Sequence, residues 1–309
     1  MSTRSAHARK PPRVLVIYKK SAYQIYVRER RHAHIEQLVK DRDPSALRLV
    51  RAHQAHLGTI EAARKTLSKL GVDAQFRHRS DQTHAQNVDL VVTLGGDGTL
   101  LWASHLVAWN TPIVAINTAP KDSVGYFCAG TRREMPEVIA AALSGDLPQT
   151  KLTRMQVSVD DKVLSQRVLN DALYCHDSPA STSRYTLRLG RTMELHKSSG
   201  VWVGPAAGSS AAQHSAGGKL LPIEAEELQF VVREPYEADG SKYQLKLGLV
   251  PKGQALKLQS HIRVGRLFLD GPHSKHPVHM AARIEFRRSP DSLLLLGFSR
   301  KASSKVKSR

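Results

Sequence analysis

The sequence has few cysteines and no long apolar stretch. Its two cysteines are Cys128 and Cys175, and neither belongs to a Cys-x-x-Cys pair. This composition excludes a disulfide scaffold and a thiolate zinc site, and it fits a reducing compartment. No apolar run approaches the roughly 18 residues that a membrane-spanning helix needs, and no signal-peptide core is visible. We therefore expect no membrane partner and a cytoplasmic location. The mitochondrial matrix is the alternative, because residues 1–13 are basic, contain serine and lack acids.

Acidic residues are also scarce relative to basic ones. The chain has 46 Lys and Arg against 27 Asp and Glu, a formal net charge of +19. Such a surface attracts polyanions, including nucleotides and nucleic acid. Aromatic residues make up only 6% of the chain, which leaves few platforms for stacking bases, so we do not expect nucleic acid as a partner. Part of the charge lies in residues 1–12 and 300–309, which are typical of solvated basic tails.

The length of 309 residues favours two domains. In residues 13–147, apolar runs at 14–18, 89–94 and 112–116 predict buried strands, with a further strand at 73–76. Between them lie segments that permit helices, which we place at 24–39, 45–70, 100–109 and 135–143. The last of these begins after a Thr131–Glu134 capping box and ends at Gly145. Strands that alternate with helices predict an α/β domain with a mostly parallel sheet.

Beyond residue 147 the pattern changes to short alternating strands. Residues 155–159 alternate apolar and polar side chains, residues 160–162 form a turn, and residues 163–174 read as one extended run. Further short runs, separated by turn residues, continue to residue 298. This pattern predicts an antiparallel, all-β domain.

A glycine-rich motif, Leu94–Thr99 (LGGDGT), lies between a buried strand and a helix. Glycines at 95, 96 and 98 allow a tight turn and close approach of a ligand to the backbone. The helix N-terminus that follows offers free N–H groups and a positive dipole end, which suit a phosphate. A carboxylate is unfavourable beside phosphate, so Asp97 indicates a base or a ligand to Mg²⁺. The competing interpretation is an ordinary Asp-Gly turn with Asp97 or Thr99 as the helix cap.

Three weaker signals follow. Ser209–Gly218 is a small-residue tract that exposes backbone to a ligand or is simply a flexible loop. The Asn170-Asp171 pair suits sugar hydroxyls but is also a common turn. Histidines spaced by three, at 273, 276 and 279, lack acidic or cysteine partners, and prolines interrupt any helix there, so we expect no metal site.

Taken in order, these motifs resemble those of the NAD kinase family, and most closely its mitochondrial type. The resemblance extends over roughly residues 13–298. The segments that carry it are Leu94–Leu101 (LGGDGTLL), Asn117–Phe127, Leu169–Asp171, Ser181–Tyr185 (STSRY), His196–Gly200 (HKSSG), Ser209–Gly218, Val232–Pro235 and Leu267–Gly271. Asp171 stands where the family usually has Glu, and Ser210 where it usually has Thr.

The resemblance implies a fold and a reaction. It implies an α/β nucleotide-binding domain over 13–147, a β-sandwich over 148–288 and a strand at 289–299 that returns to the first domain. It also implies a homodimer that transfers the γ-phosphoryl group of ATP, with Mg²⁺ or another divalent cation, to the adenosine-ribose 2′-hydroxyl of NAD, making NADP. The implied catalytic base is Asp97. The implied ATP loop comprises Gly95, Gly96 and Thr99, and the implied NAD contacts are Gly98, Tyr126, Asn170, Asp171, Lys197, Ser210, Ala211 and Ser215.

Two alternative functions remain at the level of sequence. A lipid or diacylglycerol-type kinase shares the Gly-Gly-Asp-Gly-Thr motif, but its later Gly-Thr-x-Asn-Asp segment is absent here. A non-catalytic protein that binds nucleotides or nucleic acid fits the charge and the altered loop around Ser210. The sequence leaves open NAD against NADH as acceptor, and ATP against polyphosphate as donor.

Overall fold

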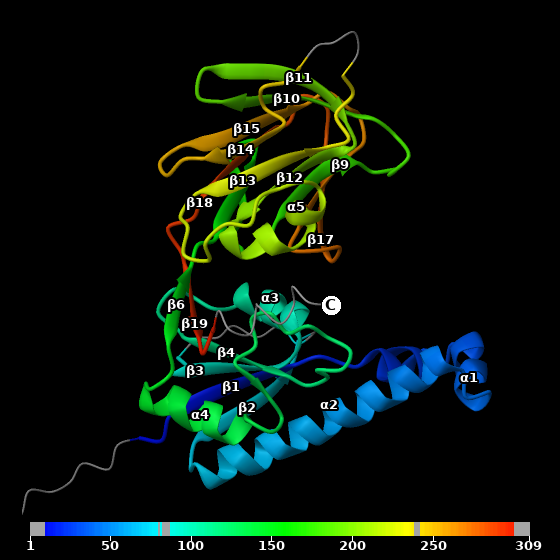
Figure 1. Ribbon diagram of the computed structural model, residues 1–309, viewed down its shortest axis with the longest axis vertical. Coiled ribbons are helices and arrows are strands. Elements are labelled where there is room, and N and C mark those ends of the chain that lie inside the picture. The colour runs from blue at the N-terminus through cyan, green and yellow to red at the C-terminus, as the bar shows by residue number, and fades with distance from the viewer. Residues whose placement is uncertain (1–9, 80, 82–86, 238–241, 300–309) are drawn as a thin grey trace, which may run out of the picture. The chain divides into compact units, whose positions relative to one another are not determined.

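A computed structural model describes residues 10–79, 81, 87–237 and 242–299 (Figure 1). Most of the two expected basic tails, at 1–9 and 300–309, lies outside these residues. The chain divides into two compact units. Unit 1 takes in the chain up to Thr150 and again from Leu294, and unit 2 comprises Lys151–Leu293.

Unit 1 is built on one twisted sheet with the strand order β2-β1-β3-β4-β19-β6, and β5 also pairs with β4. The neighbouring strands from β2 to β19 pair in parallel. The bounds are β1 Arg13–Tyr18, β2 Asp73–His78, β3 Leu90–Gly95, β4 Ile113–Asn117, β5 Gly130–Thr131, β6 Gln149–Leu152 and β19 Leu293–Leu296. Every residue of β3 and β4 is buried, as expected for central strands that are covered on both faces.

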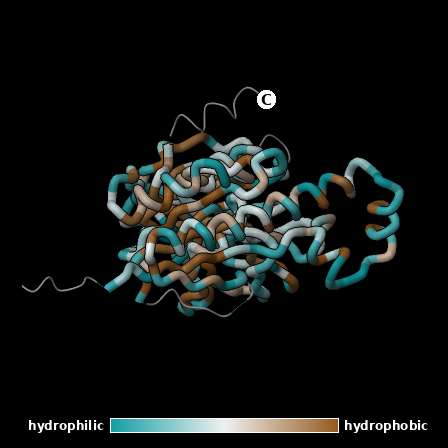
Figure 2. Tube along the Cα trace, turned by 90° about the horizontal axis from the view of Figure 1, so that it is seen from below, coloured by the Kyte–Doolittle hydropathy of each residue, from teal (hydrophilic) through white to brown (hydrophobic). Residues whose placement is uncertain are grey.

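The helices of unit 1 are η1 Gln24–Glu29, α1 Ala33–Lys40, α2 Pro44–Lys69, α3 Asp97–Ser104 and α4 Met135–Ser144. The long helix α2 is capped by Asp43, whose side chain accepts the N–H of Ser45, and it ends before Gly71, which has a φ of 64°. Ala63 and Leu67 of α2 pack against the sheet. The other end of α2 extends away from the sheet with α1 (Figure 1), and this extension is mostly hydrophilic (Figure 2).

Two expected helices differ from those observed. The segment 24–39 is not one helix, because the π-helix η1 ends at Glu29 and α1 begins only at Ala33. The helix expected over 100–109 is instead α3, Asp97–Ser104. It begins within the glycine motif because the Gly96 carbonyl already accepts the N–H groups of Thr99 and Leu100. It ends early because the following N–H groups bond three residues back, which tightens the last turn.

Unit 2 consists of two six-stranded antiparallel sheets. Their strand orders are β11-β10-β15-β18-β7-β8 and β14-β13-β12-β9-β16-β17. The bounds are β7 Met155–Val159, β8 Lys162–Val168, β9 Ala172–His176, β10 Ser183–Leu189, β11 Thr192–Ser198, β12 Gly200–Pro205, β13 Leu228–Arg233, β14 Leu247–Val250, β15 Ala255–Ser260, β16 Gly265–Leu269, β17 Ser274–Val278 and β18 Arg283–Arg288. Two short helices, η2 Ala206–Ser210 and α5 Ala212–Ser215, follow β12.

The two sheets share one apolar core. Side chains from both sheets, including Tyr174, Tyr185, Phe230 and Phe286, are buried in a single cluster. The rings of Tyr174 and Tyr185 meet edge to face with centroids 5.5 Å apart, and the Tyr174 hydroxyl donates to Ser260 Oγ at 2.8 Å. A shared core between facing sheets defines a β-sandwich, so the expected fold class, an α/β domain followed by an all-β sandwich, is confirmed.

The run expected over 163–174 is two strands, not one. β8 and β9 belong to different sheets, and Leu169–Asp171 turns between them. The turn forms because the Asp270 carboxylate accepts the backbone N–H groups of Leu169, Asn170 and Asp171. These amides therefore do not join a strand ladder.

Candidate active site

The glycine motif lies where the carboxyl ends of three parallel strands meet. The strand register places Leu94 of β3 beside Tyr18 of β1, and Gly95 beside Asn117 of β4. Lys19 and Thr118 therefore follow their strands on either side of the loop. The open end of a parallel sheet, just beyond its carboxyl ends, is where α/β folds bind ligands.

Two glycines of the motif meet different surroundings. A Cβ at Gly95 would lie 2.0 Å from Thr99 Oγ1, so the turn itself requires glycine there. A Cβ at Gly98 would meet no atom of the protein within 4 Å. The fold therefore does not require glycine at 98, whereas a ligand lying against the backbone would.

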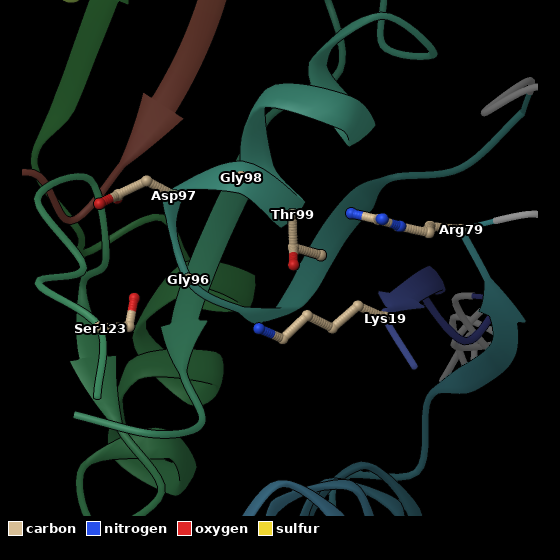
Figure 3. Close-up of a pocket in the computed structure, with 7 residues that line it drawn as sticks. All are labelled: Lys19, Arg79, Gly96, Asp97, Gly98, Thr99 and Ser123. Atoms are coloured by element: carbon tan, nitrogen blue, oxygen red, sulfur yellow. The ribbon is translucent and has the colours of Figure 1, made fainter. Parts of the chain in front are cut away.

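A cavity of about 190 Å³ opens at this loop. Its lining residues are Lys19, Arg79, Gly96, Asp97, Gly98, Thr99 and Ser123. In Figure 3 the side chains of Lys19 and Arg79 lie on the same side of the loop as Thr99. The α3 N-terminus also borders the cavity, so two cations and a helix dipole end act together on it. These positive groups outnumber the single carboxylate of the lining, that of Asp97, so the pocket attracts anions.

The surroundings of Lys19 disfavour its positive charge. Burial, together with the positive charge of Arg79, lowers the pKa of the Lys19 ammonium. Two neighbouring cations that share a partly buried pocket repel each other, and an anion bound between them relieves that repulsion. The electrostatics therefore favour a polyanionic group in the pocket.

The Asp97 carboxylate is held by the backbone of the segment at Tyr126 and Phe127. Its Oδ2 accepts the N–H of Tyr126 and its Oδ1 that of Phe127, both at 2.9 Å. In Figure 3 its side chain points away from Lys19 and Arg79. These bonds fix the orientation of the carboxylate, and each oxygen keeps a further lone pair to accept a hydrogen bond. Asp97 can thus accept a proton at one edge of an anion pocket.

Tyr126 packs inside unit 1. Its ring lies 4.9 Å from that of Phe127 and 5.6 Å from that of Phe298, measured between centroids. The ring is half-buried, so one part remains accessible beside the Asp97 loop.

In unit 2 the Asn170-Asp171 pair lies beside the small-residue tract. A Cβ at Gly208 would lie 1.8 Å from the Asn170 carbonyl oxygen, and Gln213 Nε2 donates to the same oxygen at 3.2 Å. Asn170 Oδ1 is buried without a hydrogen-bond partner. Burial, together with the Asp270 charge, raises the pKa of the Asp171 carboxyl to about 7. The pair thus offers polar groups that the fold leaves incompletely satisfied.

The other expected contacts of the tract differ in their surroundings. Ser210 ends η2 and is exposed, Ala211 is half-buried between η2 and α5, and Ser215 ends α5 and is exposed. Lys197 does not join this cluster. It lines a separate cavity of about 430 Å³ with Arg184 and Tyr236, and its Nζ lies 5.8 Å from the centroid of the Tyr236 ring.

The comparison with known proteins gives the family. A family model of the ATP-NAD kinase N-terminal domain matches residues 6–147. The NADH kinase of Arabidopsis thaliana is 30% identical over 299 residues, which cover 87% of this chain and 91% of the plant protein. This chain belongs to the NAD kinase family. The family consists of ATP-dependent phosphotransferases, and the chain is an enzyme of this class.

Further similarities agree with membership of the NAD kinase family. A probable NADH kinase of Oryza sativa subsp. japonica is 32% identical over 254 residues, which cover 75% of this chain and 78% of that protein. An NAD kinase from Archaeoglobus fulgidus, crystallised in complex with ATP, superposes with a TM-score of 0.68 at 17% identity, covering 96% of this chain and 97% of that one. At this identity the structural likeness shows the fold.

Sequence reasoning missed three residues that line the anion pocket of this NAD kinase family member. Lys19 was counted only as part of the general basic excess, and neither Arg79 nor Ser123 was singled out. A basic residue just after the first strand of an α/β domain is a usable signal for Lys19. Arg79 has no such signal, because its approach to the loop depends on the sheet order β2-β1-β3.

None of the helices in the described part of the chain has the length and apolar character needed to span a membrane.

Proposed function

We propose that this protein transfers the γ-phosphoryl group of ATP to the 2′-hydroxyl of the adenosine ribose of NAD or NADH, forming NADP or NADPH. The ribose oxygen attacks the γ-phosphorus, the bond from that phosphorus to the β-phosphate oxygen breaks, and ADP leaves. The hydroxyl proton passes to Asp97. Membership of the NAD kinase family supports the reaction class with NAD as acceptor, and the names of the two plant relatives, both NADH kinases, support NADH as a second acceptor.

The observation that carries the proposal is the cavity at the glycine loop. Lys19 and Arg79 supply positive charge on one side of the loop, and the Asp97 carboxylate lies on the other (Figure 3). Phosphoryl transfer has a loose transition state, so positioning and charge compensation supply most of the rate. We assign the phosphates of ATP to the side of Lys19 and Arg79, with Gly95, Gly96 and Thr99 shaping the loop, and the ribose hydroxyl to the side of Asp97.

Asp97 acts as the general base in this proposal. Its two backbone donors, the N–H groups of Tyr126 and Phe127, hold the carboxylate in one orientation. A positioned base contributes on the order of 10²–10⁴-fold to the rate. An oriented carboxylate also costs no reorganisation when the proton moves.

A divalent cation such as Mg²⁺, bound to ATP, would supply charge compensation for the phosphates. Within the described residues, no group of three or more His, Cys, Asp or Glu side chains is arranged to hold a metal ion. Asp97 is the one carboxylate among the residues that line the pocket. Mg²⁺ keeps several of its waters and binds largely through substrate phosphates, so a site without a cage of carboxylates fits it. The ion would be held by the phosphates of ATP on the side of Lys19 and Arg79, where it would offset their charge, and Asp97 would stay free to take the hydroxyl proton.

We assign the dinucleotide contacts as the family resemblance implies. Asn170 and Asp171 hold ribose hydroxyls, which would satisfy the unpartnered Asn170 Oδ1. Tyr126 lies against adenine. The remaining contacts are Gly98, Lys197, Ser210, Ala211 and Ser215.

A coupled assay tests the proposed function. The purified protein is incubated with MgATP and either NAD or NADH, and the phosphorylated product is measured with a strictly NADP-dependent dehydrogenase. Product that requires both substrates supports the proposal. No product from either dinucleotide, with phosphorylation of diacylglycerol vesicles in the same buffer, would contradict it. Polyphosphate in place of ATP tests the identity of the donor.

We also propose a homodimer in the cytoplasm. Light scattering on the eluting protein should give about twice the chain mass of 34.2 kDa. A mass equal to one chain at assay concentration would overturn the dimer, and import by isolated mitochondria would overturn the compartment.

A further inference from the structure

His56 is a buried histidine of α2 to which the proposed reaction gives no role. Only 2% of the residue is exposed. Its Nε2 lies 2.7 Å from the carbonyl oxygen of Lys19, and its Nδ1 lies 3.0 Å from Thr118 Oγ1. One imidazole therefore bonds to two chain segments that are far apart in sequence.

The two partners determine the protonation of the ring. A carbonyl oxygen only accepts, so Nε2 carries a hydrogen and donates it to Lys19. Burial lowers the pKa of His56 to about 4, which keeps the ring neutral at physiological pH. The Nδ1 atom of a neutral ring then has a free lone pair, so the Thr118 hydroxyl donates to it.

These two bonds connect the ends of two strands that flank the glycine loop. In the sheet, β3 lies between β1 and β4. Lys19 follows β1, Thr118 follows β4, and the loop follows β3. The Thr118 N–H also donates to the Gly95 carbonyl at 3.1 Å. His56 therefore holds both neighbours of the loop at a fixed separation.

Each bond leads to a wall of the anion pocket. On one side is Lys19, whose side chain lines the pocket. On the other side, Thr118 adjoins Asn117, whose Nδ2 donates to the carbonyl oxygen of Ser123 at 3.0 Å. Ser123 lines the pocket across from Lys19 (Figure 3).

We propose that His56 is a positioning residue that sets the spacing between the Lys19 wall and the Ser123 wall of the phosphate pocket. The inference rests on the proposed function, because it takes the triphosphate of ATP as the occupant. His56 touches no substrate and acts through Lys19 and Thr118. Its effect falls on the phosphate pocket, because both of its hydrogen-bond partners lead to walls of that pocket.

Three substitutions separate positioning from folding. His56→Phe keeps a ring and removes both hydrogen bonds. His56→Gln keeps an N–H donor near the place of Nε2 and so retains the bond to Lys19. Thr118→Val removes only the hydroxyl at nearly constant volume. His34→Gln, at an exposed position of α1, is the matched control.

We expect the effect to fall on the nucleotide donor alone. KM for MgATP should rise at least tenfold in His56→Phe and two- to fivefold in Thr118→Val, and stay within threefold of wild type in His56→Gln and His34→Gln. KM for NAD should change less than twofold throughout. A loss of global structure would instead change both KM values and the melting temperature together.

Binding of inorganic tripolyphosphate, measured by calorimetry, is the readout that does not depend on turnover. If wild type forms no NADP but His56→Phe still binds tripolyphosphate at least tenfold more weakly, the proposed function fails and the positioning role stands. If wild type forms NADP and folded His56→Phe binds tripolyphosphate as wild type does, the positioning role is overturned. Should His56→Phe not fold, an unchanged KM for MgATP in Thr118→Val overturns it equally.

Discussion

Asp270 accepts the backbone N–H of Asp171 at 3.2 Å, so its carboxylate lies against the turn at residues 169–171, where Asp171 itself is only 7% exposed. Asp270 takes two further N–H donors, from Leu169 and Asn170, so its negative charge is well satisfied. Burial and this neighbouring charge raise the pKa of the Asp171 carboxyl to about 7. Asp171 is therefore ionised at a cost to the folded state, at a position where we assign a ribose contact.

Replacing Asp171 by Asn should stabilise the protein at alkaline pH. The folded pKa of about 7 lies above the ordinary value of 3.8 for an aspartate, so the contribution of Asp171 to stability is full below pH 4 and is lost as pH rises through 7. The loss amounts to at most about 4 kcal/mol. Urea unfolding at pH 4, 6 and 8 should show the gain of Asp171→Asn growing with pH. The free energy of unfolding of the exposed control Asp161→Asn, relative to wild type, should not change with pH. An equal gain in the free energy of unfolding of Asp171→Asn at all three pH values would contradict this account of Asp171.

Adding a methyl group to the glycine loop should separate ligand effects from folding effects. Gly98→Ala should fold as well as wild type or better, because its Cβ meets no protein atom and alanine favours a helix by about 1 kcal/mol. Its catalytic efficiency should nevertheless fall at least tenfold. Gly95→Ala should lose stability itself, because its Cβ would lie 2.0 Å from Thr99 Oγ1. Thermal melts measure the stability of the two variants, and steady-state kinetics measure their catalytic efficiency. Full activity in Gly98→Ala would show that no ligand lies against that backbone.

Removing either cation of the pocket should weaken binding of the phosphate donor. Lys19→Met and Arg79→Met keep the aliphatic length and remove the charge. Each should raise KM for MgATP by about tenfold, since a charge-assisted hydrogen bond contributes roughly 1.5–3 kcal/mol. KM for NAD should stay within twofold. Arg77→Met, at an exposed position of β2, is the control. Equal kinetics in Lys19→Met and Arg77→Met would remove Lys19 from the donor site.

The folded protein should become less stable in acid because His56 is buried as a neutral ring. Its folded pKa of about 4 lies below the ordinary value of 6.5 for a histidine, so its contribution to stability is full above pH 6.5 and is lost as pH falls through 4. Burial is the main cause, and the nearby charges of Lys19, His53 and His78 add to it. The expected loss is about 3 kcal/mol. Chemical unfolding between pH 7 and 4 should show a shallower decline in His56→Gln. Parallel curves for the two proteins would refute this role of His56.

The glycine motif could be predicted from sequence because its signals are local. Residues 89–94 form an apolar run, and the glycines that follow mark a turn into a helix. The fold class also followed from the change in pattern near residue 147. The edge strands β11, β14 and β17 could not be predicted, because strands at the rim of a sheet expose apolar residues such as Met193 and Leu249, so hydrophobicity in the sequence no longer marks the buried face.

The rest of the pocket depends on the order of strands in the sheet. Lys19, Arg79 and Ser123 are separated by dozens of residues along the chain, and they meet only because β2, β1, β3 and β4 lie side by side. His56 depends on the same arrangement, since its two partners follow β1 and β4. Apart from the place of Lys19 just after the first strand, spacing in the sequence carries none of this information.

The role of Asp97 is tested most directly by Asp97→Asn. The amide keeps the size of the side chain and one oxygen that can accept a backbone N–H, but it cannot take the hydroxyl proton. The amide nitrogen faces the second backbone N–H donor, so we predict a folded protein whose melting temperature falls by several degrees, with a KM for MgATP within threefold of wild type and a kcat lower by about 10²–10⁴-fold. A folded Asp97→Asn protein that forms NADP within a few-fold of the wild-type rate would contradict the assignment of Asp97 as the base.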